Sequence, residues 1–160
     1  MHFDKHTARD FGLVDNGNDT AFDPADGSSW KRVPLYDYGW GPENGYYKEP
    51  LPDAATLISI LLAEESIEDR YGAAAIIERD YPEELLQKCE RMMGDPVQVE
   101  DFARVIEAFH LEHPLNRSRI EGKSYDEIKT DSERWKRVSE YAVKTKEAQK
   151  RRASFYIGKR

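Results

Sequence analysis

The chain has 160 residues, of which 39% are hydrophobic and 34% are charged, so the simplest organisation is a single domain, residues 1–160, with a strongly solvated surface. No apolar run approaches the roughly 20 residues needed to span a bilayer, and the first residues have neither the basic start nor the apolar stretch of a secretory signal. We therefore expect a cytoplasmic protein with no membrane partner. The single cysteine, Cys89, excludes an intramolecular disulfide framework.

The charge is divided unevenly along the chain. The whole chain has 24 basic and 31 acidic residues, a formal net charge of -7. Residues 123–160 contain 12 of the basic and 6 of the acidic residues and carry +6, so subtraction leaves 12 basic and 25 acidic residues, or -13, in residues 1–122. Two interpretations follow. Either the acidic part attracts a basic partner and speeds its association, or the basic end neutralises the acidic part of the same chain.

Residues 1–52 show no sustained helical period and are rich in Gly, Asp, Asn and Pro. Six aromatic residues lie within 18 positions of this segment, whereas disordered segments are poor in aromatic residues. We therefore expect an irregular lobe that aromatic side chains pin to the rest of the protein. Residues 30–38 are compatible with a short strand, which Pro34 would place at an edge, and Asn44-Gly45 is compatible with a tight hairpin turn.

Residues 53–113 have apolar residues at spacings of three and four, the interval that places side chains on one face of a helix. Asp53 and Ser66 suit N-cap positions, and Pro82 suits the first turn of a helix. We expect four short amphipathic helices arranged as two stacked antiparallel pairs. Their apolar faces comprise, in order, Ala54, Leu57, Ile58, Leu61 and Leu62; Ile67, Tyr71, Ala74, Ala75 and Ile77; Leu85, Leu86, Cys89, Met92 and Met93; and Val99, Phe102, Ala103, Ile106 and Phe109.

A long helix is expected from about Tyr125 to about Phe155, preceded by the capping pair Ser124 and Glu127. Its apolar stripe thins toward the basic residues near its end, which indicates that the front half packs on the body and the back half projects or frays. The sequence therefore predicts a mainly α fold. In this fold two stacked antiparallel helix pairs, HEAT-like or in an irregular bundle, lie between an irregular aromatic-rich N-terminal lobe and a long C-terminal helix, residues 124–156.

The pair Leu61-Leu62 ends the first expected helix, and Asp69-Arg70 precedes a run of small residues in the second. This pattern over residues 51–78 resembles a HEAT-type helical repeat, in which small residues let the second helix approach its neighbours closely. Residues 81–113 resemble a second, degenerate unit without the small-residue run. The resemblance implies a stacked helical scaffold. Because such repeats usually need three or more units for stability, the aromatic lobe and the last helix would serve as caps.

His110 and His113 are spaced so that both can approach one cation at a helix end, but no second pair of Cys or His follows at a ligand spacing. Histidines at this position also interact favourably with the helix dipole. We therefore expect no metal and no cofactor. Phosphate-binding and nucleophile-elbow motifs are missing from the sequence, so we expect no catalytic residues and a protein that is not an enzyme. Two other possibilities stay open: an enzyme with His110 or His113 as its base, and a subunit of a larger assembly.

The acidic part of the chain and its aromatic residues suit protein binding, since carboxylates steer a basic partner and aromatic side chains anchor interfaces. We expect a non-enzymatic binding protein, a small acidic inhibitor or immunity-type protein that neutralises a basic protein partner such as a toxin nuclease. The residues expected to bind this partner are Glu64, Glu65, Glu68, Asp69, Trp30, Trp40, Tyr46 and Tyr47.

The alternative is a nucleic-acid-associated or phage accessory protein that acts through its basic C-terminal helix. Aromatic residues near the basic end would permit base stacking. The acidic remainder of the chain would repel phosphate, so nucleic acid is the less expected partner.

Overall fold

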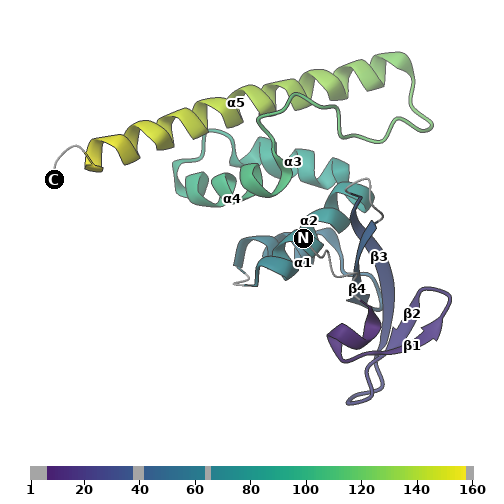
Figure 1. Cartoon of the computed structure of the whole chain (residues 1–160). Coiled ribbons are helices and arrows are strands. Elements are labelled where there is room, and N and C mark those ends of the chain that lie inside the picture. Colours follow the sequence, from purple (N-terminus) through teal and green to yellow (C-terminus); the bar gives the residue numbers. More distant parts are fainter. Residues whose placement is uncertain (1–6, 38–41, 64–65, 158–160) are drawn as a thin grey trace.

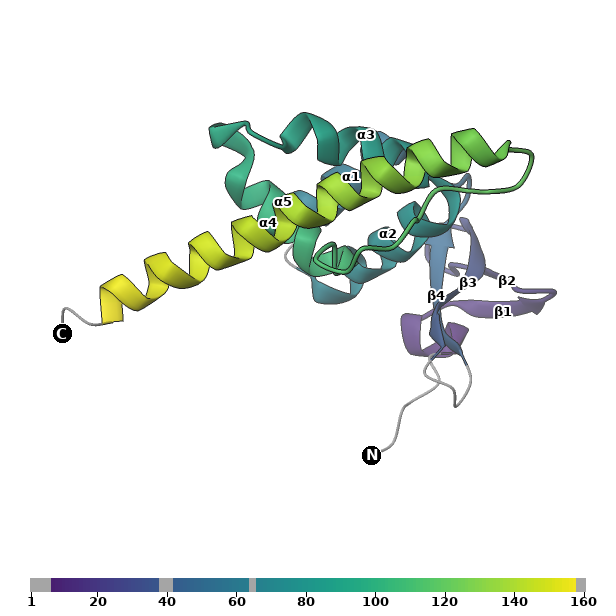
Figure 2. The same cartoon turned by 90° about the horizontal axis from the view of Figure 1, so that it is seen from above.

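The computed structural model describes residues 7–37, 42–63 and 66–157, which form an N-terminal sheet followed by helices (Figure 1). The elements in chain order are η1 (Ala8–Phe11), β1 (Val14–Gly17), β2 (Thr20–Phe22), β3 (Ser29–Asp37), β4 (Pro42–Lys48), α1 (Ala54–Ala63), α2 (Ile67–Asp80), α3 (Pro82–Met92), η2 (Pro96–Gln98), α4 (Val99–Phe109) and α5 (Tyr125–Ile157). The sheet meets the helices where β3 contacts α2. α5 lies across α3 and α4 on the other side of the helical part (Figures 1 and 2).

The prediction of a mainly α fold with an irregular N-terminal lobe is wrong, because this lobe contains a four-stranded antiparallel sheet and the protein is mixed α/β. The strands follow the order β1-β2-β3-β4, so each pairs with its neighbour in sequence. Asn18 and Asp19 form the two-residue turn of the first hairpin with φ of 53° and 60°, a backbone region that Asn and Asp adopt more readily than most residues. β1 and β2 have only four and three residues, too few to show the alternation that identifies a strand in sequence.

β3 is an inner strand and not the edge strand that Pro34 suggested. Its residues 29–31 pair with β2, and β4 pairs along its other side. Pro34 lies beyond the part that β2 covers, and the β3–β4 register shifts between Pro34 and Tyr36, an irregularity that tolerates proline. The hairpin turn expected at Asn44-Gly45 is also wrong, because these residues pair with β3 inside β4. The connection, residues 38–41, lies outside the described residues.

The β3–β4 ribbon packs on both of its faces. Side chains alternate between faces along a strand, and the register places Val33 and Tyr47 on one face and Trp30 and Tyr46 on the other. Val33 is buried, and Tyr47 packs against the core of the helical part. Trp30 and Tyr46 pack against a small second cluster, which consists of Ala8, Leu13 and Ala21.

The helices expected from the apolar spacing are present, and the caps of α1 and α5 match the sequence signals. Asp53 Oδ1 accepts the Thr56 N–H at 2.7 Å at the start of α1. Ser124 and Glu127 form a reciprocal pair at the start of α5, with 2.8 Å from the Ser124 N to Glu127 Oε2 and 3.4 Å from the Glu127 N to Ser124 Oγ. Within the described residues, every helix is too short or too polar to cross a bilayer.

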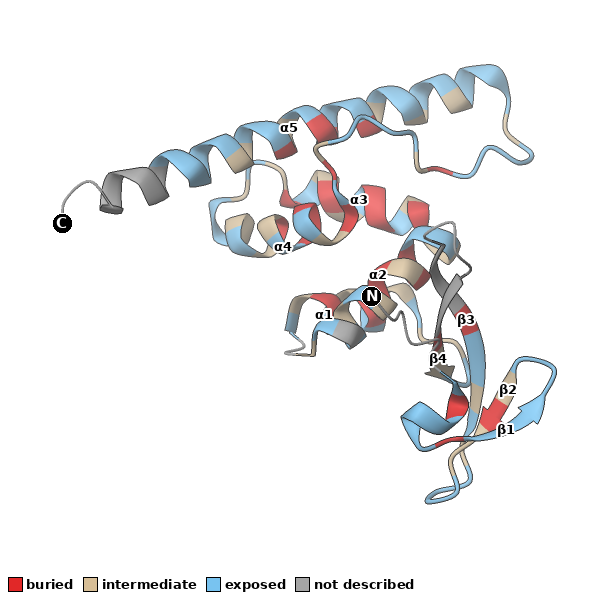
Figure 3. Ribbon diagram, viewed as in Figure 1, coloured by how far each residue is buried: buried red, intermediate tan, exposed pale blue. Residues whose placement is uncertain are grey.

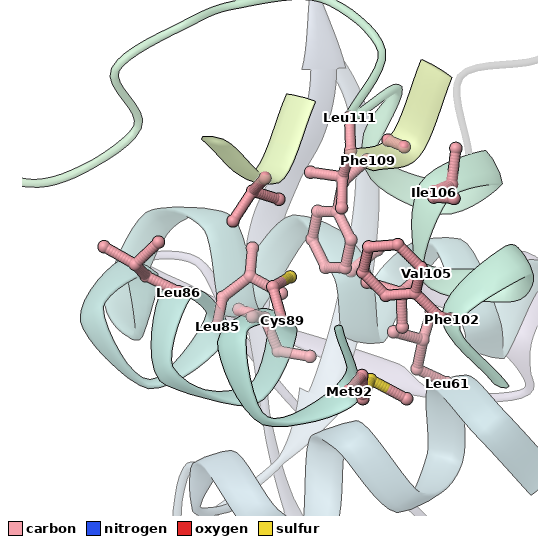
Figure 4. Packing of buried hydrophobic residues seen from close by; sticks show 14 of the residues in the cluster. Leu61, Leu85, Leu86, Cys89, Met92, Phe102, Val105, Ile106, Phe109 and Leu111 are labelled. Carbon is pink, nitrogen blue, oxygen red and sulfur yellow. The ribbon is translucent and has the colours of Figure 1, made fainter. Parts of the chain in front are cut away.

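One apolar core joins all five α-helices, and the buried residues gather where the helices face one another (Figure 3). Leu61 of α1 and Cys89 of α3 are fully buried in it, and Phe102 of α4 is 1% exposed (Figure 4). α5 contributes Trp135, Val138 and Ala142 to the same core. These three lie at spacings of three and four residues, so only one side of α5 is committed to packing.

Residues 111–124, called the strap below, connect α4 to α5 through specific contacts. Leu111 is buried in the core. The Trp135 Nε1–H donates to Ser118 Oγ at 3.0 Å, and the Arg119 guanidinium donates to the Asp80 carbonyl at 2.7 Å. The strap therefore ties the front of α5 to α2 and α3 although it has no regular secondary structure.

Candidate docking surface

α2 presents two large apolar side chains to solvent. The sequence pattern placed Ile67 and Tyr71 on the buried face of this helix, but their exposed fractions are 61% and 51%, so that prediction is wrong. The buried face is set by the later turns, whose buried residues are Ala73, Ala74, Ile76 and Ile77. At about 100° of rotation per residue, Ile67 and Tyr71 lie about 100° and 140° from the middle of that face.

The exposed pair has a defined backbone position. Ser66 Oγ accepts the Asp69 N–H at 3.3 Å and caps α2, so Ile67 is its first helical residue. Tyr71 follows one turn later, which puts both apolar side chains on the same side of the helix. Asp69, between them in sequence, is also exposed. The pair is therefore displayed by a packed helix and not by a loop.

Carboxylates are concentrated around this end of α2. Four of the residues expected to bind a partner fall, in sequence, between α1 and α2 or in the first turn of α2: Glu64, Glu65, Glu68 and Asp69. Glu64 and Glu65 lie outside the described residues, as does the side chain of Glu68. Asp69 is the part of this set that the structure describes; it is exposed, but it lies two residues from both Ile67 and Tyr71 and therefore on another side of the helix.

A second acidic face meets the same end of the α1–α2 hairpin. The Arg104 guanidinium of α4 donates to the carbonyl of Leu62, in the last turn of α1, where carbonyls have no partner within the helix. Glu100 and Glu107 are exposed one turn before and one turn after Arg104.

The end of the α1–α2 hairpin and this outer face of α4 are called the acidic end below. Its charged residues are Glu64, Glu65, Glu68, Asp69, Glu100 and Glu107 against Arg70 and Arg104. By sequence these residues carry -4, of which the side chains that the structure describes, Asp69, Glu100 and Glu107 against Arg70 and Arg104, account for -1.

The aromatic residues expected to bind a partner lie in the sheet and not at the acidic end. Trp30 is half-buried, and its Nε1–H donates to Ser28 Oγ at 2.9 Å. The Tyr46 ring lies 5.7 Å from the Phe11 ring, centroid to centroid, and Tyr47 packs on the helical core. Trp40 falls outside the described residues. The structure therefore does not bring this aromatic set together with Asp69 into one site.

The basic front half of α5 pairs with carboxylates of the body. Arg134 holds Glu90 of α3 through two hydrogen bonds of 2.9 and 2.6 Å, and Lys146 holds Glu112 of the strap at 2.5 Å. The hydrogen bonds from Arg134 lower the pKa of Glu90 against the opposing effect of burial. Neutralisation within the chain thus accounts for part of the basic segment. Among the described residues, these ion pairs do not include the carboxylates of the acidic end.

The described surface also has two shallow hollows, of about 300 and 350 Å³. The first lies beside Lys123, whose ammonium group already contacts Asp131 at 2.7 Å and Glu83 at 2.9 Å. His110 ends α4 with φ of 49° and is exposed, as is His113. Within the described part of the chain, no three His, Cys, Asp or Glu residues come together as a group that could hold a metal.

No protein-family model matches the chain, and neither the curated proteins nor the solved structures contain a match. The HEAT-type resemblance therefore stays a prediction. The position of the acidic end could be found only in part from sequence. Its acidic residues can be selected from sequence, whereas no sequence signal connects Arg104 to Leu62, which lies 42 positions away.

Proposed function

We propose that this chain is a non-enzymatic protein-binding module whose acidic end docks a basic protein, in the manner of a small inhibitor or immunity-type protein. The observation that supports the proposal is the exposure of Ile67 and Tyr71 on one packed helix whose first turn is acidic in sequence. Covering each of these side chains would contribute on the order of 1–2 kcal/mol to binding. Apolar anchors with a charged surround are a common composition for the centre of an interface.

The charge of the acidic end selects the class of partner. The charge of -4 that these segments carry by sequence would attract a basic surface and raise its association rate, and this effect would weaken as salt screens it. The apolar pair acts at short range and slows dissociation. A basic protein with an apolar hollow among its cationic residues fits both properties.

The first experiment tests the apolar anchors. Tagged wild-type protein is incubated with lysate of its native host, and the captured proteins are identified by mass spectrometry. The test variant is I67S/Y71S. The matched control is I120S/Y125S, which removes the same two residue types from the strap and the first turn of α5, where they are 62% and 79% exposed. We expect one basic protein to be captured by the wild type and by the control and to be lost from I67S/Y71S. Capture of an acidic protein, equal capture by both variants, or capture of nothing would contradict the proposal.

The second experiment tests the charges with the purified partner. Reversal to lysine at Glu64, Glu65, Glu68 and Asp69 is compared with reversal at the control set Glu121, Asp126, Glu133 and Glu140, which also contains three Glu and one Asp. We expect the first set to lower the association rate at least about tenfold at low salt and by much less at high salt. The control set should have a clearly smaller effect. Equal effects of the two sets would show that only net charge matters and not the acidic end.

A further inference from the structure

The last part of α5 extends beyond the body of the protein. Ala142 is fully buried, and the ion pair between Lys146 and Glu112 is the last described contact that joins α5 to the strap. From Glu147 to Arg151 every residue is exposed, while the helical backbone continues to Ile157. Both views show this end projecting past α4 (Figures 1 and 2). About three helical turns, roughly 16 Å at about 1.5 Å per residue, therefore lie outside the packed part of the protein.

This projecting end is basic. Residues 147–157 contain Lys150, Arg151 and Arg152 against Glu147, so they carry +2. Cations nearer the front of α5, such as Arg134, are paired with body carboxylates, as shown above. The described ion pair in the projecting part is between Arg151 and Glu147, at 4.0 Å with side chains 83% and 59% exposed. A pair so exposed contributes little and exchanges readily for another anion.

The projection weakens the repulsion that the acidic body would exert on a polyanion. Charges in solution are screened over about 8 Å at physiological ionic strength. The helix end reaches about twice that length beyond Lys146 along its axis. A polyanion on the last turn would therefore be largely screened from the -13 of residues 1–122, whereas at Lys150 and Arg151, about 6–8 Å beyond Lys146, the repulsion is only reduced. The sequence indicated that the back half of this helix projects or frays, and the structure adds that its backbone stays helical to Ile157.

We propose that the projecting end of α5, residues 147–157, is a docking element for duplex DNA and lies in its major groove. A lone helix about 10–12 Å in diameter fits this groove, which is about 12 Å wide, and the corresponding groove of duplex RNA is too narrow. Lys144 and Arg151 are exposed two turns apart on one side of the helix, and Lys150 is exposed about 100° around it. The cations can thus reach phosphates on both walls of the groove. This activity is separate from the capture of a basic protein at the acidic end.

The test measures the fluorescence anisotropy of a labelled 20-base-pair DNA duplex as the full-length protein is added, at several salt concentrations. We expect a dissociation constant between about 1 and 100 µM with a steep dependence on salt. K150Q/R151Q should weaken binding at least about tenfold and reduce the slope of log K against log salt by about 2. The matched control is K129Q/K136Q, which removes two exposed cations from the packed half of α5 and should change both quantities far less.

Three results would overturn the inference. The first is no salt-dependent binding of DNA at 100 µM protein. The second is an equal loss in both double variants, which would mean that net charge alone matters. The third is equal affinity for a duplex RNA of the same sequence, since the groove of that duplex does not admit the helix. Sedimentation of the protein alone provides a further discriminator. Self-association at low salt that K150Q/R151Q removes would assign the basic end to the acidic body of a second copy instead of DNA.

Discussion

At the scale of single residues, the contact between Trp135 and Ser118 decides where the strap lies. Trp135 is 2% exposed and Ser118 is 6% exposed, and the indole N–H donates to the hydroxyl at 3.0 Å. Ser118→Ala would leave a buried N–H without an acceptor, so we expect a loss of about 1–2 kcal/mol in the free energy of unfolding. Urea denaturation measures this loss. The control is Ser132→Ala, at an exposed position on α5, the helix that contains Trp135. It should change the free energy of unfolding by less than about 0.5 kcal/mol.

A double-mutant cycle separates this hydrogen bond from packing. Trp135→Phe removes the N–H, so Ser118→Ala in that background should cost about 1 kcal/mol less than it does in the wild type. Additive effects of the two substitutions would show that the hydrogen bond does not hold the strap.

Cys89 is a second residue whose environment has a measurable consequence. Burial raises the pKa of its thiol from 9.0 to about 12. Below pH 9 the thiol is neutral in both the folded and unfolded states, and its contribution to stability is fully present. Above pH 9 the unfolded chain loses the proton first, so this contribution falls as pH rises, by at most about 1.4 kcal/mol per pH unit. The difference in unfolding free energy between the wild type and Cys89→Ala should therefore narrow from pH 9 to pH 11. A constant difference would contradict the burial of the thiol.

At the scale of elements, α5 is attached to α3 by an ion pair whose strength depends on pH. The two hydrogen bonds from Arg134 hold the pKa of Glu90 below its usual value of 4.5. The stabilisation is therefore present above pH 4.5 and is lost as pH falls through the lower, folded-state pKa. Glu90→Gln should lower the unfolding free energy by about 1 kcal/mol at pH 7, and the difference from wild type should shrink below pH 4.5.

Glu84→Gln is the matched control for this prediction. Glu84 is exposed on α3, the helix that contains Glu90. Its substitution should change the unfolding free energy by less than about 0.5 kcal/mol at pH 7 and at pH 3. A difference between wild type and Glu90→Gln that persists unchanged at pH 3 would show that Glu90 acts through packing and not through its charge.

The elements also show what sequence can and cannot reveal. The helices were predictable because the helical spacing of apolar residues and the N-cap residues indicate the same elements. Examples are Asp53 before α1 and Ser124 with Glu127 at the start of α5. The sheet was missed because its first strands are short and because Asn44-Gly45, a turn signal, lies inside β4. The phase of α2 was misjudged because Ile67 and Tyr71 fit helical spacing, and spacing alone does not show which side of a helix its neighbours cover. The acidic residues could be selected from sequence. The contribution of α4 to the acidic end could not, since it rests on the long-range contact of Arg104.

At the scale of the whole molecule, packing divides α5 into two halves with different consequences. Its front half supplies core residues and ion pairs, and in its projecting end residues 147–151 are exposed. Truncation of the projecting end can therefore change the net charge of the protein without removing core residues. Removing residues 149–160 deletes five basic residues and no acidic residue, which moves the net charge from -7 to -12.

We expect the chain of residues 1–148 to keep its unfolding free energy within about 0.5 kcal/mol of the full-length value, because the deleted residues that the structure describes lie outside the core. Urea denaturation followed by circular dichroism checks this expectation. The same truncation should abolish binding to duplex DNA. It should leave the association rate of a basic protein at the acidic end unchanged or increase it, since the truncation removes positive charge that repels this partner. Loss of both activities from a stable truncated protein would mean that the two surfaces are one site. A large loss of stability would show that the end of α5 packs on the body after all.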